Sequence, residues 1–279
     1  MALGIPLNHS STVTAPSRRR MPSAMRRAGL VLAELVVPAG LIAGWLLWSA
    51  GSKNLYFPPL ADIVKSLQQT WLFSHLRSDA VPSLWHLGAG YLIATAVGVA
   101  IGTSLGLMPR AADALKPILE FLRAVPGIVL LPAALLILGI GPRTQVTLIA
   151  YGAVWPILLN TADGVSGIDP TIRDVARSYR IAGLNRLCRI TLRAASPQIV
   201  AGMRTALSIA ITVIVFSEMV GSTNGIGYQI LQAQRDFDVP AVWGGMVFLG
   251  VIGYLLNVLF RGFEQAVLRW HRGMRIAAR

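Results

Sequence analysis

The chain has 279 residues, of which 54% are hydrophobic and only 13% carry a charged side chain. A soluble domain typically carries about 25% charged residues, so this composition excludes an ordinary soluble protein and indicates lipid as the surrounding solvent. The formal net charge of +13 would fit a nucleic-acid-binding protein. However, the basic residues flank apolar segments, as residues that set membrane topology do. We therefore expect a membrane protein without a nucleic-acid partner.

The N-terminal segment, residues 1–28, is polar and basic, and we expect it to form a cytoplasmic tail. The apolar stretch that follows, residues 29–50, exceeds the roughly 7–15 apolar residues of a secretory signal and lacks a clear cleavage site. We interpret it as a retained transmembrane helix.

Five further segments approach or exceed the roughly 20 apolar residues that cross a bilayer. They are residues 84–108, 117–139, 144–165, 197–220 and 241–262. The sequence therefore predicts an all-α protein with six transmembrane helices in a membrane domain over residues 29–270, followed by a cytoplasmic tail over 271–279. We expect the third span to be kinked at Pro126 or Pro132, because proline removes a helix hydrogen bond.

Two connections on the opposite side of the membrane from the tails are longer than turns. Residues 51–83 contain an amphipathic stretch over 61–71, and residues 221–240 contain another over 229–237. We expect both stretches to be short helices along the outer surface.

The basic residues define one orientation. With both termini cytoplasmic, twenty Lys and Arg residues lie on the inner side, Arg123 among them, and five lie outside. This asymmetry follows the positive-inside rule and predicts a multi-pass protein of the cell membrane.

Small residues recur at every fourth position of the second span: Gly90, Ala94, Gly98, Gly102 and Gly106. In lipid, such a face permits close contact between helices, so the pattern predicts a tightly packed bundle without specifying a function.

The longest inner loop, residues 166–196, is rich in arginine and shows helical periodicity. Asp169 and Pro170 are a typical helix start, and Gly183 suits the position just past a helix end. Ile172, Val175, Ala176 and Tyr179 recur at near-helical spacing, which gives the predicted helix one apolar face. Such a helix can dock into a groove on another protein or lie on anionic lipid, and the pattern alone favours neither.

Glu218 lies near the outer end of the fifth span, where an ionisable residue is by default a functional hypothesis. It could line an outer gate or contact an extracytoplasmic partner. The alternative is a carboxylate hydrogen-bonded to the turn Gly221–Asn224. We also consider Arg123, Asn224 and Tyr228 as candidates for the pathway or its gate, although Arg123 could instead pair with Glu120.

Several motifs are absent from the sequence. It contains no P-loop, no HExxH and no GxSxG motif, so we expect no ATP site, no cofactor and no catalysis in this chain. A single cysteine, Cys188, and scattered histidines indicate no metal site. The acidic residues lie near span ends, which disfavours a gradient-driven secondary transporter, the main alternative class.

Two stretches of the inner loop carry a family resemblance: RDVARSYRIAG at 173–183 and LRAASPQIVAGMR at 192–204. They resemble the cytoplasmic loop of ATP-binding cassette importer permeases, in particular the nitrate/sulfonate/taurine branch. Residues 117–131, 138–142 and 217–228 also fit that branch, and the resemblance covers about residues 55–270.

The resemblance implies that this loop couples the chain to an ATPase. Asp174 stands where the family has Glu, Val175 and Ala176 where it has two alanines, and Arg180 where it has glycine. Arg193 replaces the proline that follows the family leucine. The implied coupling residues are Arg173, Asp174, Val175, Ala176, Arg177, Tyr179, Arg180, Gly183, Leu192 and Pro197.

The implied fold is a type I importer permease bundle that works by alternating access. Two permease copies, as a homodimer, would form the pathway, and an extracytoplasmic binding protein would deliver the solute. Two cytoplasmic subunits would bind ATP and Mg²⁺ and grip the helix between Pro170 and Ala182, with Ala176 on the docking face. The implied solute is a small oxyanion such as a sulfonate, taurine or nitrate; the alternative is a thiamine-precursor or flavin-like solute.

Overall fold

The computed structural model describes residues 36–37, 39–49, 51 and 54–270. The chain divides into two units, Met1–Gly51 and Ser52–Arg279. In the first unit, Ala39–Ser49 is a short apolar helix that includes part of the expected first span. The rest of that span (29–35, 38 and 50) and the two tails, 1–28 and 271–279, lie outside the described residues.

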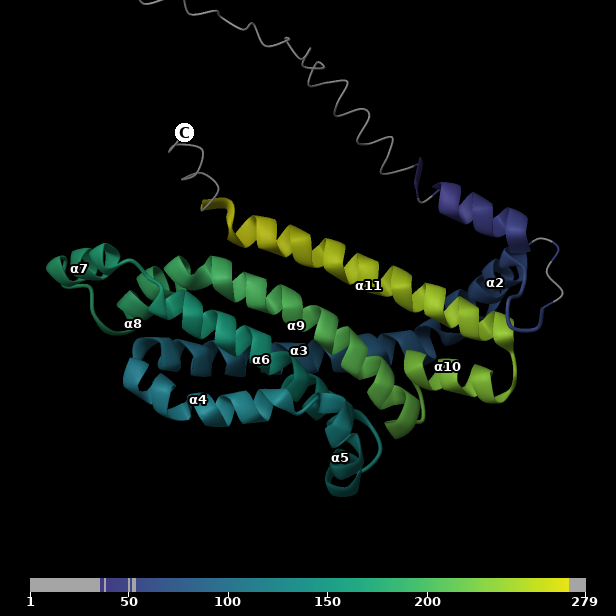
Figure 1. The fold of residues 1–279 in the computed structure, drawn as a ribbon, viewed down its shortest axis with the longest axis horizontal. Coiled ribbons are helices and arrows are strands. Elements are labelled where there is room, and N and C mark those ends of the chain that lie inside the picture. The colour runs from purple at the N-terminus through teal and green to yellow at the C-terminus, as the bar shows by residue number, and fades with distance from the viewer. Residues whose placement is uncertain (1–35, 38, 50, 52–53, 271–279) are drawn as a thin grey trace, which may run out of the picture. The chain divides into compact units, whose positions relative to one another are not determined.

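Every regular element in the described part of the second unit is helical (Figure 1). The α-helices are α2 (Leu60–Ser66), α3 (Val81–Leu107), α4 (Pro109–Ala124), α5 (Leu131–Leu138), α6 (Pro142–Ser166), α7 (Pro170–Ser178), α8 (Gly183–Arg186), α9 (Leu192–Gly221), α10 (Ile226–Arg235) and α11 (Val239–Val267). Short π-helical or 3₁₀ segments connect some of them: η1 (Leu67–Ser74), η2 (Leu76–Ala80), η3 (Gly127–Leu130) and η4 (Leu187–Thr191).

In the described part of the chain, four helical segments are long and apolar enough to cross a membrane: Leu76–Leu107, Pro142–Ser166, Gly183–Gly221 and Val239–Val267. A fifth span is formed if α4 is combined with the segment Gly127–Leu138, to which it is bent by 75°. These correspond to five of the six expected spans. The predicted kink is confirmed; Val125, which precedes Pro126, is extended, the conformation that a following proline favours.

The third span begins earlier than the sequence predicted. Helix α4 starts at Pro109, directly after α3, rather than at residue 117. Proline suits the first helical turn because its missing N–H has no partner there. None of the α4 residues is buried, so this amphipathic helix lies on the surface of the unit.

The core lies where α6 packs against both α3 and α9. The small-residue face of α3 makes this possible: a Cβ added to Gly90 would lie 2.7 Å from Ile149 Cβ, and one added to Gly106 would lie 2.6 Å from Val165 Cβ. The predicted close packing of the second span is thus confirmed, with α6 as its partner.

The two short helices expected in these connections are present as α2 with η1, and as α10. Trp71 in η1 is buried, stacks on Phe248 of α11 with 5.4 Å between ring centroids, and donates its indole N–H to Ala241 O. Figure 1 shows α2 and α10 at one end of the unit and α7 and α8 at the other.

Candidate functional site

Helix α7 is the centre of the expected coupling loop, and its start is as predicted. Asp169 is the N-cap, and its carboxylate accepts a hydrogen bond of 2.7 Å from the Thr171 backbone N–H. Hydrogen bonding from the Thr171 side chain and backbone holds the pKa of Asp169 below its ordinary value. Pro170 occupies the first turn.

The end of α7 differs from the prediction. The helix ends at Ser178, and the residue in the left-handed conformation after it is Arg180, with φ of 52°, rather than Gly183. Ile181 N–H donates to Ala176 O at 2.9 Å, and Arg180 N–H donates to Arg177 O at 3.0 Å. These bonds form a Schellman motif, in which the residue at position 180 is left-handed. Glycine adopts that conformation with less strain than arginine does. Gly183 also has a positive φ, of 58°, but it begins α8.

The apolar face of α7 is divided between the interior and the surface. Ala176 is only 1% exposed, whereas Val175 is 50% and Tyr179 is 77% exposed. Ala176 therefore does not lie on an outward docking face as expected; its side chain is covered by this chain. The available apolar surface comes from Ile172, Val175 and Tyr179.

Arg173 connects α7 to the helix before it. Its Nη2 donates to the carbonyl oxygens of Val165 at 3.0 Å and Ser166 at 2.8 Å, at the C-terminal end of α6. A guanidinium there satisfies carbonyls that have no partner within the helix and lies at the negative end of its dipole. Asp174 and Arg177 form an exposed ion pair of 3.2 Å.

The remaining loop candidates lie further along. Leu192 begins α9 and packs against the buried cluster of Val165, Ala195 and Ile199, which links the loop to the end of α6. Pro197 lies inside the same helix.

At the other end of the unit, a buried polar network joins η2, α3, α9 and α10. Glu218, 1% exposed, accepts a hydrogen bond from Ser83 Oγ at 2.5 Å and one from Gly227 N–H at 3.0 Å. Ser83 Oγ in turn accepts from Ile226 N–H at 3.0 Å.

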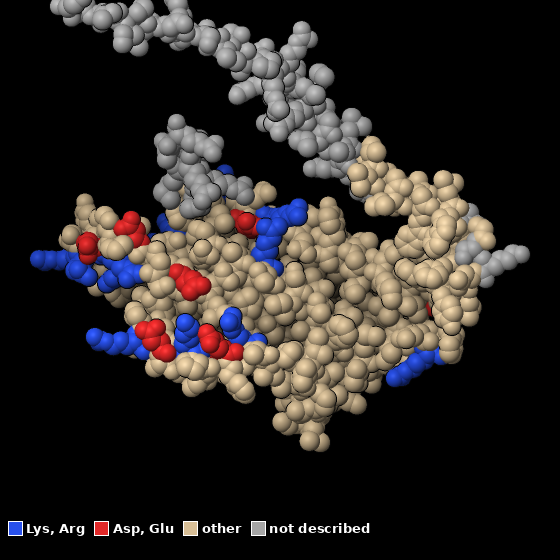
Figure 2. All heavy atoms as spheres, viewed as in Figure 1, with Lys and Arg blue, Asp and Glu red and all other residues tan. Residues whose placement is uncertain are grey.

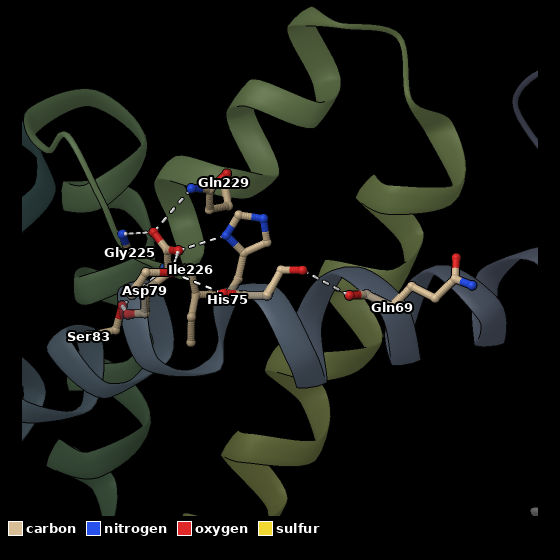
Figure 3. A network of polar contacts seen from close by, with 9 residues as sticks. Gln69, His75, Asp79, Ser83, Gly225, Ile226 and Gln229 are labelled. Atoms are coloured by element: carbon tan, nitrogen blue, oxygen red, sulfur yellow. Dashed lines mark hydrogen bonds and ion pairs between the residues drawn. The ribbon is translucent and has the colours of Figure 1, made fainter.

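Asp79 is the second carboxylate of this network, and the sequence analysis missed it. Its Oδ1 accepts from Gly225 N–H at 2.9 Å and Gln229 Nε2 at 3.1 Å, and its Oδ2 lies 2.8 Å from His75 Nδ1 (Figure 3). An acid three residues before Pro82, at the start of a span, was the only available signal in the sequence.

The network holds the loop after α9 against that helix. Gly225 has φ of 113°, and a Cβ there would lie 2.5 Å from Glu218 Cδ. A Cβ on Gly227 would overlap the Val215 carbonyl oxygen. Glu218 therefore anchors the backbone at Gly227, a few residues beyond the turn that we had considered.

The other outer candidates form local contacts. Asn224 is exposed, and its backbone oxygen accepts a hydrogen bond of 2.6 Å from Ser222 Oγ. Tyr228 Oη accepts a hydrogen bond of 2.7 Å from Gln232 Nε2.

A cavity of about 420 Å³ lies between the α4–η3 bend, α6 and α9. Its lining residues are Arg123, Val125, Pro126, Gly127, Ile128, Gly152, Trp155, Pro156, Ser208, Ile209, Thr212 and Val213. Arg123 also borders a second cavity, of about 370 Å³, whose lining includes Asp113, Lys116, Glu120 and Asp163. Among the described residues, no ion pair joins Glu120 to Arg123.

Comparison with known proteins identifies the family. The family model described as "Binding-protein-dependent transport system inner membrane component" matches residues 94–272. The chain belongs to this family. It is accordingly a multi-pass inner-membrane permease of an ATP-binding cassette importer, and it is a transport subunit rather than an enzyme.

Similar members of this permease family carry names that refer to anions. The chain is 30% identical over 238 residues to the putative aliphatic sulfonates transport permease SsuC of Bacillus subtilis, covering 85% of this chain and 86% of that protein. It is 28% identical over 275 residues to the bicarbonate transport permease CmpB of Synechococcus elongatus, with 92% and 99% covered. It is 33% identical over 177 residues to the nitrate import permease NrtB of Leptolyngbya laminosa, with 63% of each covered.

A solved structure supports the fold of this permease. The inward-facing MetNI methionine ABC transporter matches with a TM-score of 0.60 and 20% sequence identity. The match covers 72% of this chain and 98% of that chain. The expected type I importer bundle is thus confirmed.

Proposed function

We propose that this permease imports a small oxyanion, such as a sulfonate, taurine or nitrate, by ATP-driven alternating access. The observation that carries the substrate class is the set of names of its relatives, since sulfonates, bicarbonate and nitrate are all small oxyanions. A thiamine-precursor or flavin-like solute is the runner-up, and direct competition during uptake separates the two.

We infer that α7 binds a cytoplasmic ATPase and transmits its conformational change to the helix bundle. Ile172, Val175 and Tyr179 offer an exposed apolar surface on a short helix, which fits a groove on a partner protein. Asp174, Arg177 and Arg180 are exposed charged residues of the same segment. ATP and Mg²⁺ are bound by the partner, and Ala176 contributes by holding α7 against this chain.

The contacts of α7 support a direct route from the ATPase to the bundle. Arg173 ties α7 to the last carbonyls of α6, and α6 packs between α3 and α9. A displacement of α7 therefore moves the end of a central helix. Leu192 reinforces the connection through its contacts with Val165.

We propose that two copies of the permease assemble as a homodimer. Val129, Leu136 and Ile137 of η3 and α5 are largely uncovered in a single copy, where they contact lipid or a second copy. Homodimers with closed two-fold symmetry are the commonest oligomers.

The proposed orientation places α7, α8 and both chain termini in the cytoplasm. On the face drawn in Figure 2, most charged side chains gather over α4 and over the end formed by α7 and α8. A concentration of Lys and Arg at one membrane face is typical of the cytoplasmic side. The opposite end, with α10, is then available to an extracytoplasmic binding protein.

The test is copurification of the tagged permease from its native membrane, with mass spectrometry of the proteins that accompany it. We expect a P-loop ATPase and a binding protein. The reconstituted complex should then take up labelled taurine or nitrate only with ATP, without competition from a thiamine precursor. Gradient-driven uptake by the permease alone, without an ATPase, would refute the proposal.

A further inference from the structure

The cavity of about 420 Å³ lies halfway along two membrane-spanning helices. Helix α6 spans Pro142–Ser166 and contributes Gly152, Trp155 and Pro156, which are at its middle. Helix α9 spans Leu192–Gly221 and contributes Ser208 and Thr212, also near its middle. An arginine at this depth is costly unless it faces a water-filled space or a partner, so Arg123 requires an explanation.

Arg123 is held beside this cavity by specific contacts of its neighbours. Tyr151 Oη donates a hydrogen bond of 2.7 Å to the carbonyl oxygen of Leu122, which attaches the end of α4 to α6. The Tyr151 ring packs edge-on against Trp155, with 5.6 Å between centroids and 82° between planes. The helix ends at Ala124, so the chain turns away immediately after Arg123.

Arg123 does not belong to the inner surface, where the positive-inside count placed it. Arg123 borders cavities lined by residues 152–163 of α6, from the middle of that span toward its C-terminal end. In the part of the chain that the structure describes, its guanidinium has no hydrogen-bond acceptor and no ion-pair partner. Five N–H donors therefore remain available to a ligand.

The rest of the cavity wall complements an anion. Arg123 is the only charged residue among the described residues that line this cavity; the carboxylates of Asp113, Glu120 and Asp163 line the adjacent cavity, which Arg123 also borders. Trp155 lines the cavity, and its Nε1 atom is buried without a hydrogen-bond partner among the described residues. Ser208 and Thr212 place two hydroxyls one turn apart on α9, and Thr212 uses its proton on the Ser208 carbonyl oxygen at 3.1 Å.

We propose that this cavity is an anion site within the membrane, at which Arg123 and the Ser208 hydroxyl bind one small oxyanion beside the Trp155 ring. The ligand class, a nitrate or a sulfonate, rests on the proposed function. A guanidinium binds planar oxyanions such as nitrate, and tetrahedral ones such as a sulfonate, through paired, charge-assisted hydrogen bonds. The volume of about 420 Å³ falls in the range of small-molecule sites, and the apolar walls strengthen the electrostatic attraction. Arg123 is then the residue that selects anions inside the permease itself.

Trp155 provides a direct optical test, because nitrate quenches indole fluorescence. The full-length permease in lipid nanodiscs is titrated with sodium nitrate at constant ionic strength, and the titration of Trp155→Phe is subtracted to isolate one of the seven tryptophans. We expect saturable quenching that methanesulfonate, which does not quench, reverses by competition.

The Arg123→Gln variant should bind nitrate roughly tenfold to hundredfold more weakly, the effect of losing hydrogen bonds to a charged group. Arg123→Lys should keep part of the affinity. Arg110→Gln removes the same charge from the first turn of α4, outside this cavity, and should bind nitrate like the wild type. Unchanged quenching by neutral acrylamide shows that the variants keep the fold and the access of solvent.

Linear, non-saturable nitrate quenching in the wild type, or saturable quenching equal in Arg123→Gln, would overturn the proposal. The outcome is independent of the importer assay. If the reconstituted complex fails to take up taurine or nitrate while Arg123-dependent binding persists, the proposed function fails and the site stands. If uptake by the Arg123→Gln complex keeps the wild-type concentration dependence, the site is refuted and the importer stands.

Discussion

Replacing Arg180 with glycine should stabilise the end of α7, the helix that we assign to ATPase coupling. Arg180 has φ of 52°, a left-handed conformation that costs a non-glycine residue roughly 1–2 kcal/mol. Glycine adopts it without steric cost but loses more backbone freedom on folding. The net gain should be about 1 kcal/mol, which corresponds to a roughly fivefold lower population of the open helix end.

Hydrogen exchange of α7 measures this gain. The Ile181 N–H, which donates to Ala176 O, should exchange about fivefold more slowly in Arg180→Gly than in the wild type. Arg180→Ala is the control, because it removes the guanidinium but keeps the Cβ atom, and it should show no slowing. Equal slowing in both variants would refute the reasoning, since the relief would then come from lost charge repulsion and not from the backbone conformation.

Three further predictions follow from buried contacts. Ala176→Asp places a charge at a position that is 1% exposed and should unfold α7 locally, whereas Tyr179→Asp should leave α7 folded and weaken ATPase copurification; hydrogen exchange of α7 distinguishes the two. Gly227→Ala should lower stability by about 1–3 kcal/mol through overpacking, whereas Gly250→Ala, with open space at its Cβ, should not; thermal unfolding in detergent compares them. Glu218→Ala should cost about 1–3 kcal/mol for each buried donor left unpaired, and Glu218→Gln should cost less in the same assay.

The chemistry of the loop explains how one departure from the family pattern is tolerated. The family glycine at position 180 is replaced by Arg180, yet the Schellman hydrogen bonds at the end of α7 are still made. The strain remains local because the side chains of Tyr179 and Arg180 are exposed. A side chain would not be tolerated in this way at Gly225 or Gly227, since Glu218 and Val215 lie directly against them.

The sequence by itself determined the features that depend on local composition. Hydropathy located the spans from 84 onward, because a lipid-facing helix requires a continuous apolar stretch. The proline at 126 predicted the bend, and Asp169 with Pro170 predicted the start of α7, because these residues act on their own backbone. The spacing of small residues in α3 predicted close packing, although not the identity of α6 as the partner.

Only the tertiary structure decided the features that join distant segments. Ser83 and Glu218 are 135 residues apart in the chain, and no periodicity links them. Ala176 and Val175 are both apolar, but the packing of α7 against its own chain buries the first and exposes the second. Arg123 resembles an ordinary topology signal in the sequence, and its depth became evident only from the cavities that it borders. Burial and depth depend on which helices meet, and this is set by long-range packing rather than by any single segment.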